Sequence, residues 1–348
     1  MTHPYASLPA RAFWRSSVAG RSAREIEDVW RPKFEIRPAT PIATFGSCFA
    51  QHIGAALRAR AFNWLQTEPP PRALSPDNAR AHGYDQFTCR TGNIYTAKML
   101  RQWSDWSLGA TQAPAEFWES DGRWFDPFRP TLEPGGFASR EEARALRNFT
   151  LRSFARAVEA ADIFVFTLGL TEGWRHRAQD YEYQICPGTR EGRFDAQAHE
   201  FYNADYGEIL ADLAGALDAM TGANRRVKFL LTVSPVALAA TASDQHVLVA
   251  TTESKSILRA VAGAVARSRA NVDYFPSYEL VSSAALAGDR LAPDRRNASP
   301  EGVAQVMEAF FAALGSPAAP PAESERAPER QVDAQCDEEL LQAFAPRA

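Results

Sequence analysis

A serine and a cysteine stand side by side in the stretch TFGSCFA, residues 44–50. Ser47 and Cys48 are both capable of nucleophilic attack on a carbonyl carbon, once activated by a base. Gly46 permits a tight turn that a residue with a Cβ atom would resist. A helix beginning after this turn would direct N–H groups towards a developing oxyanion. Two interpretations of Ser47 stay open here, a nucleophile and a helix N-cap. Cys48 is more typical of a small, inward-packed side chain.

A nucleophilic serine needs a general base, and histidine is the usual one. The chain contains six histidines: His3, His52, His82, His176, His199 and His246. His52 follows Ser47 by five residues, so helical geometry turns its side chain well away. His246 follows the stretch TVSPV by about ten residues and could reach the mouth of a site at that strand end. We take His246 as the candidate base. No histidine pair has metal-ligand spacing, so no metal ligand is assigned.

Other polar residues follow apolar stretches. FTLGLTEGW contains Gly169, Thr171 and Glu172. The Thr171 hydroxyl could donate to an oxyanion, and Glu172 could orient a partner group or bind substrate. TGNIYT adds Gly92 and the amide of Asn93. The alternative interpretation is that both stretches are polar connecting loops without a chemical role.

The elements that must position these residues alternate between buried strands and amphipathic helices. Short apolar runs predict strands at 41–46, 162–170 and 227–236, and at the start of 271–280. Apolar spacing predicts helices at 48–60, 96–106, 139–161, 206–220, 253–270 and 299–314. This alternation predicts an α/β sandwich with a mainly parallel sheet. Ligands bind outside the carboxyl ends of such strands, where the polar stretches above fall.

Residue types at the helix ends support these boundaries. Ser139 followed by Glu142 predicts a capping box. Ser299 followed by Pro300 predicts an N-cap with proline in the first turn. Lys255 and Arg259 share one face of the helix at 253–270, either as a solvated cationic stripe or as an anion-binding pair.

Composition bounds the class of protein. The chain has 348 residues, 45% of them hydrophobic and 23% charged, with a net charge of -4. This predicts a globular protein without a broad basic surface for nucleic acid. Four scattered cysteines do not form a disulfide framework. No signal peptide or membrane span is apparent, so we expect a cytoplasmic location.

The same pattern predicts how the chain is divided. We expect residues 1–40 to form an arm packed on the core and residues 41–315 to form the main domain. Within that domain, residues 61–138 should be an irregular, aromatic insertion. Residues 316–348 are rich in proline, alanine and charge, which is typical of a largely disordered tail, although its last stretch EELLQAFAP, residues 338–346, could form a short docking helix.

Several segments, in order, resemble the GSCFA family: TFGSCFA, GNIYTA, FTLGLTEGW, TVSPV, SKSILRA and FPSYE. The resemblance covers roughly residues 40–312. This family is similar to the SGNH (GDSL-like) hydrolases. The resemblance therefore implies a flavodoxin-like, three-layer α/β/α sandwich and a site for an acyl ester, for which an acylated carbohydrate or lipid is a candidate substrate. It implies no metal and no organic cofactor.

Residue by residue, the resemblance implies that Ser47 is the nucleophile and that its own N–H is one oxyanion donor. Gly92 matches the glycine of the second SGNH block. Gly169 and Thr171 match the third block, where threonine replaces the usual asparagine. The expected oxyanion hole is thus built from the N–H groups of Ser47, Gly92 and Thr171, with Asn93 and Glu172 as neighbouring binding groups.

The last SGNH block, Asp-x-x-His, is altered. Asp294 matches the aspartate, but Asn297 stands at the histidine position and accepts no proton at neutral pH. Either His246 acts as the base with Asp294 in support, or another group closes the site, or hydrolysis has been lost and ligand binding kept. Two functions follow from these options. One is an esterase or O-acyltransferase, and the other is an impaired module that binds a carbohydrate or acyl ligand.

Overall fold

The computed structural model describes residues 3–22, 25–286, 290–315 and 336–345. Its central sheet contains four parallel strands in the order β1 (Ile42–Gly46), β4 (Ile163–Leu168), β8 (Lys228–Val233) and β9 (Val272–Tyr274). A parallel bridge between Ile42 and Trp64 extends the sheet on the far side of β1. Numbered along the chain, the order is 2-1-3-4-5, which is the flavodoxin-like arrangement. The predicted α/β fold with a parallel sheet is confirmed.

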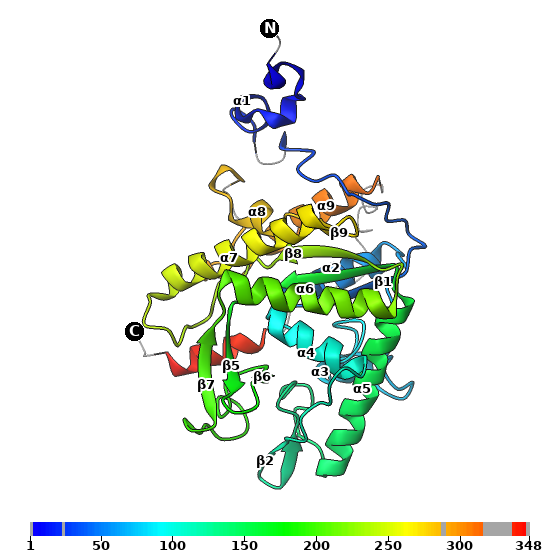
Figure 1. Cartoon of the computed structure of the whole chain (residues 1–348), viewed down its shortest axis with the longest axis vertical. Helices are drawn as coiled ribbons and strands as arrows, with labels where there is room; N and C mark the ends of the chain where they lie inside the picture. Colours follow the sequence, from blue (N-terminus) through cyan, green and yellow to red (C-terminus); the bar gives the residue numbers. More distant parts are fainter. Residues whose placement is uncertain (1–2, 23–24, 287–289, 316–335, 346–348) are drawn as a thin grey trace.

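Helices cover both faces of this sheet (Figure 1). One face packs against α2 (Phe49–Ala59) and α9 (Pro300–Ala313), through side chains such as Ile163 and Val165. The other face carries Phe164, Phe166 and Leu168 of the same strand. It packs against α4 (Ala97–Ser107), α5 (Arg140–Ala160), α6 (Tyr206–Ala223) and α7 (Val247–Ser268). The side-chain alternation of a strand therefore divides the core into two layers.

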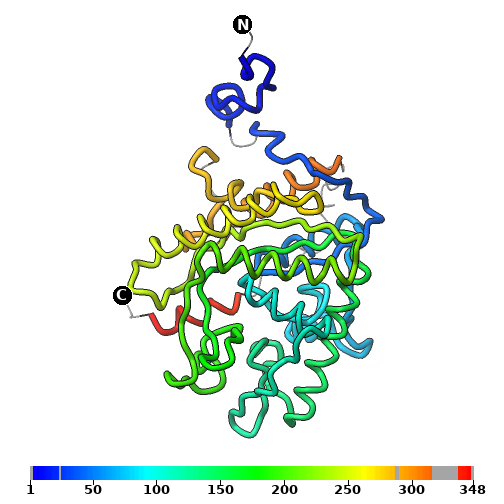
Figure 2. Tube along the Cα trace, in the orientation of Figure 1, coloured from blue at the N-terminus to red at the C-terminus, as the bar shows by residue number. Residues whose placement is uncertain are grey.

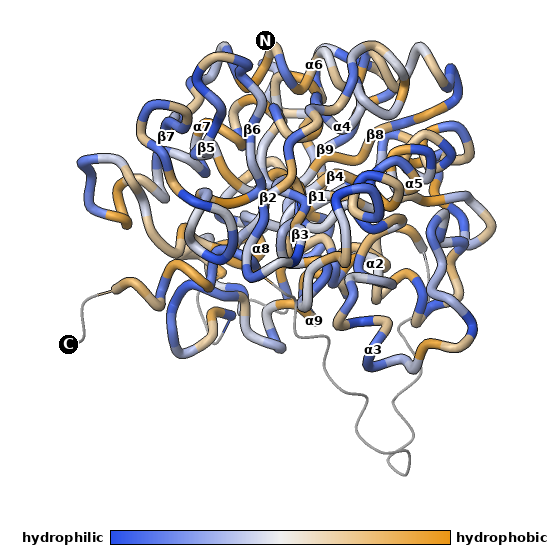
Figure 3. Tube along the Cα trace, turned by 90° about the horizontal axis from the view of Figure 1, so that it is seen from below, coloured by the Kyte–Doolittle hydropathy of each residue, from blue (hydrophilic) through white to orange (hydrophobic). Residues whose placement is uncertain are grey.

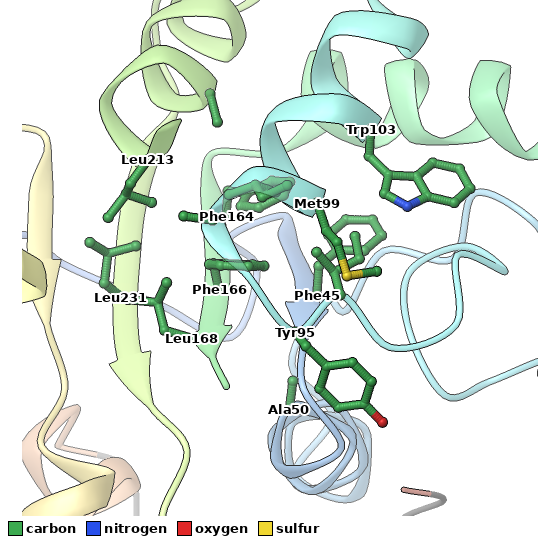
Figure 4. Packing of buried hydrophobic residues seen from close by; sticks show 14 of the residues in the cluster. Phe45, Ala50, Tyr95, Met99, Trp103, Phe164, Phe166, Leu168, Leu213 and Leu231 are labelled. Atoms are coloured by element: carbon green, nitrogen blue, oxygen red, sulfur yellow. The ribbon is translucent and has the colours of Figure 1, made fainter. Parts of the chain in front are cut away.

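Figure 4 shows the second layer at close range. Phe45, Phe164 and Phe166 stack beside Met99 of α4, and all four are buried. Tyr95 lies at the end of this cluster and directs its hydroxyl away from the phenylalanines. The cluster thus fixes the backbone of Tyr95 while leaving its hydroxyl for polar contacts beyond the strand ends.

The predicted helices and strands of the core are present with small shifts in their ends. Ser299 caps α9 by accepting the N–H of Gly302 at 3.0 Å, with Pro300 in the first turn. The capping box predicted at Ser139 is half formed. Ser139 accepts the N–H of Glu142, but Glu142 accepts the N–H of Ala138 and not that of Ser139.

Several short elements were not predicted. They include α1 (Trp14–Ser17), α3 (Pro76–Ala81), α8 (Ser277–Ser282) and the hairpin of β2 (Trp118–Ser120) and β3 (Arg123–Phe125). A second sheet contains β5 (Glu172–His176) between β6 (Glu182–Tyr183) and β7 (His199–Asn203), all antiparallel. This sheet continues directly from the stretch after β4, so Glu172 lies on a strand and not in a loop.

The N-terminal and C-terminal segments of the chain pack differently on the main domain. Trp30, Phe34 and Ile36 are buried in the core layer below α9, whereas the segment 3–22 projects from the body (Figure 2). Residues 336–345, placed by the sequence in the tail, form a 3-10 helix, Asp337–Phe344, that packs on the main domain. We name residues 336–345 the closing segment. The prediction for 316–335 lies outside the described residues.

Apolar residues concentrate inside the body and polar residues line its outer loops (Figure 3). Within the described residues, no helix combines the length and the apolar character needed to cross a membrane.

Candidate functional site

Ser47 stands directly after β1, at the carboxyl edge of the parallel sheet. Gly46 has a φ of 133°, a conformation that favours glycine. A Cβ atom on Gly46 would lie 2.5 Å from the main-chain oxygen of Thr167 on the neighbouring strand β4. The backbone turn that presents Ser47 therefore requires a residue without a side chain.

The hydroxyl of Ser47 is buried, with 2% of the residue exposed, and its Oγ has no hydrogen-bond partner among the described residues. The N-cap of α2 is Cys48, and no side chain caps this helix. The alternative interpretation of Ser47 as a helix N-cap is therefore not supported. A buried hydroxyl without a partner is energetically unfavourable and calls for an explanation, such as a functional role.

Two further unpartnered atoms lie nearby, Thr167 Oγ1 and Gln184 Oε1. Thr167 pairs with Gly46 across the sheet, and the Gln184 amide nitrogen donates to the Asn93 main-chain oxygen at 2.9 Å. Buried polar atoms without partners thus surround the end of β1, a pattern that is unusual in a core built only for packing.

The backbone around Ser47 is tightly packed. The Ile94 N–H donates to the Gly46 oxygen at 2.8 Å, which places the 92–95 stretch against the end of β1. The Tyr95 oxygen accepts the N–H groups of Gly169 and Leu170 at 2.9 and 3.0 Å. A Cβ on Gly169 would lie 2.9 Å from Ser47 Cβ. The structure thus brings together Ser47, Gly169 and the stretch containing Gly92 and Asn93, as expected from the rule for strand ends.

The predicted oxyanion hole is only partly available. The N–H of Ser47 donates to the Thr167 oxygen at 3.0 Å. The N–H of Thr171 donates to Ser254 Oγ at 3.2 Å, and the Thr171 hydroxyl donates to Asn203 at 2.6 Å. The Gly92 N–H, at a residue with a φ of 66°, donates to no other described residue. Of the three predicted N–H donors, Gly92 is the one left for a ligand in this conformation.

The structure does not bring a histidine to Ser47 Oγ, because no described residue hydrogen-bonds to that atom. His246 is exposed and forms the N-cap of α7, where its Nδ1 accepts the Leu248 N–H at 3.2 Å. The sequence placed this imidazole in the site as a base. In the structure one of its two ring nitrogens serves the helix end instead.

Asp294 and Asn297 lie together, as the resemblance implied, but they bond to each other. Asp294 accepts the N–H groups of Arg296 and Asn297 and the Asn297 side-chain amide, at 2.9, 3.0 and 2.7 Å. Burial raises the pKa of Asp294, but these hydrogen bonds outweigh it and the net pKa is lowered. Asp294 is exposed and holds a turn, and the Asn297 amide also donates to Glu339 of the closing segment at 3.3 Å.

The closing segment covers this edge of the sheet. Asp337 accepts hydrogen bonds from the Asn93 amide at 2.7 Å and the Thr131 hydroxyl at 2.6 Å. Cys336 packs with Cys48 in a small buried cluster. A hydrogen bond from Cys48 lowers the pKa of Cys336 to about 6, burial opposes it, and Arg296 at 3.4 Å lowers it further. Cys48 is therefore a packed thiol, as the sequence favoured.

Buried ionisable groups, a lysine of α7 and a glutamate of the closing segment, lie at this edge of the sheet. Lys255 is 1% exposed, and its Nζ donates to the Gly169 oxygen at 2.6 Å. Burial lowers the pKa of Lys255 to about 8, and Glu338 opposes this change. Burial raises the pKa of Glu338 to about 8. Arg259 instead pairs with Glu279, so Lys255 and Arg259 form neither a solvated stripe nor a joint anion site.

A cavity of about 290 Å³ opens between β5, β6, β7 and the closing segment. Its apolar walls include Leu170, Trp174, Phe201, Leu341 and Phe344. Its acidic groups are Glu172, Glu182, Asp337 and Glu338. Burial raises the pKa of Glu172, although the Thr241 hydroxyl donates to its carboxylate at 2.8 Å. No cluster of three or more metal-ligating side chains occurs within the ranges described above.

The carboxyl group of Glu182 tests how strongly this wall of the cavity excludes water. Burial raises the pKa of Glu182 to about 8, and a hydrogen bond from Thr96 at 2.5 Å opposes this only in part. A carboxyl group with a raised folded-state pKa stabilises the fold below its unfolded pKa, and this contribution is lost as the pH rises through the folded value.

We therefore expect Glu182→Gln to match the wild type in unfolding free energy near pH 4.5, the unfolded value. Above about pH 8 the variant should be more stable by at least about 1.4 kcal/mol, the equivalent of one pKa unit. Urea unfolding across this range measures the difference. If the difference in unfolding free energy between Glu182→Gln and the wild type did not change with pH, the raised pKa of Glu182 would be contradicted.

A family model matches the chain over residues 41–310, and it is the GSCFA family. The chain belongs to the GSCFA family. Among curated proteins, no significant sequence match was found.

Two solved structures show distant similarity. One is a carbohydrate esterase family 3 protein from Talaromyces cellulolyticus, at 13% identity and a TM-score of 0.35, covering 79% of this chain and 96% of the other. The second is described as a candidate platelet activating factor from Streptococcus pneumonia. It has 12% identity and a TM-score of 0.28, and the match covers 44% of this chain and 60% of the other. Neither similarity is close enough to carry a statement about activity.

Sequence reasoning missed the residues of the site that come from distant parts of the chain. These are Tyr95, Thr131, Ser254, Cys336, Asp337 and Glu338. Tyr95 had a usable signal, since it follows Asn93 in the stretch GNIYT. The acidic run at 337–339 has the composition of a solvated tail, so local pattern gave no indication that two of its carboxylates are buried.

Proposed function

We propose that this protein is a serine-dependent esterase or O-acyltransferase of the SGNH type and that Ser47 is its nucleophile. The observation that supports it most is the state of the Ser47 hydroxyl. It is buried, has no hydrogen-bond partner among the described residues, and is presented at the carboxyl end of β1 by a glycine turn that tolerates no side chain. Because no described base is bonded to Ser47 Oγ, the proposed reaction passes the Ser47 proton to the leaving oxygen.

In the proposed reaction, Ser47 Oγ forms a bond to the acyl carbon of an ester. The Gly92 N–H donates to the oxygen that becomes negatively charged. The bond from the acyl carbon to the leaving oxygen then breaks, and the leaving alcohol carries away the proton released by Ser47. Water or an acceptor hydroxyl then forms a bond to the acyl carbon, the bond from that carbon to Ser47 Oγ breaks, and Ser47 Oγ takes the proton that the attacking hydroxyl releases. The apolar cavity next to Leu170 suits the acyl chain or the apolar face of a sugar, so acylated carbohydrates and lipids are the proposed substrates.

A second candidate function is a module that binds an acyl or carbohydrate ligand without turnover. Two observations favour it: Asn297 stands in place of a histidine, and the N–H groups of Ser47 and Thr171 are already used within the protein.

A fluorophosphonate probe separates these two functions, because it reacts covalently with activated serines. We expect an adduct on the peptide that contains Ser47 and a loss of labelling by about 10³-fold or more in Ser47→Ala. Peptide mass spectrometry locates the adduct. Ser107→Ala is the matched control, since Ser107 Oγ is also buried without a partner but lies at the end of α4. Its labelling should equal that of the wild type.

His246→Asn completes the experiment, because asparagine is an equally good N-cap and cannot act as a base. From the capping geometry we expect its labelling to stay within about twofold of the wild type. A tenfold or greater loss would restore His246 as the base. No adduct on Ser47, under conditions that label a control esterase, would favour the binding module.

A further inference from the structure

The carboxylate of Asp337 is held by three uncharged donors. The Asn93 amide donates at 2.7 Å, the Thr131 hydroxyl at 2.6 Å and the Tyr95 hydroxyl at 3.3 Å. The Asp337 N–H in turn donates to the Tyr95 hydroxyl oxygen at 2.9 Å. Asn93, Tyr95 and Asp337 are all buried, and Asp337 lies 244 residues after Asn93 in the chain. These contacts therefore form a built site for a carbon–oxygen group, filled by a distant part of the same chain.

This site adjoins Ser47. The main chain of Tyr95 hydrogen-bonds to Gly169, whose Cα faces Ser47 Cβ so closely that a methyl group would lie 2.9 Å away. Cys336, the residue before Asp337, packs against Cys48, the residue after Ser47. Two independent lines of contact thus connect this site to residues that pack against or flank Ser47.

The chemistry of the site suits a neutral carbonyl better than a carboxylate. Burial raises the pKa of Asp337, and the hydrogen bonds from Thr131, Asn93 and Tyr95 oppose this only in part. Burying a charge among uncharged donors is costly, whereas a carbonyl oxygen is well satisfied by such hydrogen bonds. An ester carbonyl or a protonated acid therefore matches this site with less desolvation than Asp337.

The remainder of the closing segment fills the entrance to the cavity. Leu341 and Phe344 line the cavity, although Phe344 is 64% exposed. Arg296 contacts Glu338 at 3.4 Å and Glu339 at 3.5 Å. The segment is held mainly by polar contacts at residues 336–339, and its later apolar side chains are not buried. Its release therefore requires less free energy than unfolding of the domain.

We propose that Asn93, Tyr95 and Thr131 form a subsite for a carbonyl or carboxylic acid group of the ligand, separate from the ester carbonyl that Ser47 attacks, and that Asp337 occupies it in cis. The closing segment must then leave before a substrate binds. The identity of the ligand rests on the proposed function of Ser47, but the occupation of the subsite by Asp337 does not.

Alkylation of Cys48 by iodoacetamide tests the closure without using activity. Cys48 is 3% exposed and lies under Cys336, so it reacts only when the segment has moved. We expect Asp337→Ala in the full chain to increase the rate of Cys48 alkylation by about tenfold or more, which corresponds to the loss of hydrogen bonds to a charged group. Quantitative peptide mass spectrometry measures the rate.

Two controls separate local release from unfolding. Gln342→Ala changes an exposed residue of the same segment and should leave the Cys48 rate unchanged. Cys89 is 1% exposed inside the other core layer, so its alkylation should stay slow in Asp337→Ala. Equal Cys48 rates in the wild type and Asp337→Ala, with Cys89 protected in both, would overturn the closure.

Hexanamide, which carries an uncharged carbonyl group, tests the chemistry of the subsite in the Asp337→Ala variant. It should slow Cys48 alkylation in a saturable way, and the protection should be lost in Asp337→Ala/Thr131→Val, which removes one donor and keeps the shape. Absence of protection in Asp337→Ala would overturn the carbonyl subsite. If the Cys48 results hold while no variant reacts with a fluorophosphonate at Ser47, the proposed esterase function fails and the closure stands.

Discussion

Replacing Asp126 by alanine should lower the free energy of unfolding by about 3–5 kcal/mol, because it leaves two buried guanidinium groups without their counter-ion. Asp126 is 1% exposed and accepts hydrogen bonds from Arg129 at 2.9 Å and from Arg147 at 2.7 and 3.0 Å. Arg129 and Arg147 are 1% and 2% exposed. The Asp126–Arg147 contact joins the insertion to α5, so its loss should loosen the packing of the insertion on this helix.

Urea unfolding with matched m-values measures the effect. Burial raises the pKa of Asp126, but Arg147 and Arg129 outweigh it and lower the net pKa. The charged carboxylate therefore stabilises the fold above its ordinary pKa of 3.8, and this contribution is lost as the pH falls through the lowered folded value. The difference in unfolding free energy between the wild type and Asp126→Ala should become smaller only in strong acid.

Asp218→Ala is the control, since Asp218 pairs with Arg269 on the surface and exposes 66% of its side chain. Its unfolding midpoint should be nearly that of the wild type. An Asp126→Ala protein as stable as this control would mean that the buried arginines find other partners.

The second large effect is expected from Gly46→Ala. The new methyl group would lie 2.5 Å from the oxygen and 2.6 Å from the nitrogen of Thr167, both main-chain atoms of the central strand β4. Neither can move without disturbing the hydrogen bond from the Ser47 N–H to the Thr167 oxygen. We expect a loss of about 3 kcal/mol in stability from the strained φ and the clash together.

The same change should displace Ser47 Oγ and reduce fluorophosphonate labelling by at least about 10²-fold, since a shift of about 1 Å has effects of that size. Gly222→Ala is the matched control. Gly222 lies in α6 with no neighbouring atom within 4 Å, so alanine should stabilise the helix by about 0.5–1 kcal/mol. A stable, fully reactive Gly46→Ala protein would contradict the need for glycine at the turn.

The central layer could be predicted because its strands are short apolar runs, and buried parallel strands are of this kind. The stretch 163–168 is buried at every residue. The second sheet could not be predicted from the sequence. Its strands β5 and β7 have the sequences EGWRH and HEFYN, which contain charged residues and little alternation of apolar and polar side chains. Their pairing comes from cross-strand contacts that a single stretch does not contain.

The candidate site, too, could be predicted only in part. The meeting of Ser47 with Gly169 follows from the topology of a parallel sheet, and it was predicted on that ground. The use of the Thr171 N–H by Ser254, and of the Asn93 amide by Asp337, depends on which side chains arrive from α7 and from the end of the chain. Such long-range hydrogen bonds leave no local pattern, and this is why His246 looked suitable and Asp337 did not.

The position of the closing segment at 336–345 has a consequence for biosynthesis. Asn93, Tyr95 and Thr131, and every strand of the central sheet, precede it in the chain. A ribosome adds about 5–20 residues per second, so the 20 residues at 316–335 separate the end of the core from the segment by about one to four seconds. Newly made molecules would therefore pass through a period in which the core has been synthesised and Ser47 is uncovered.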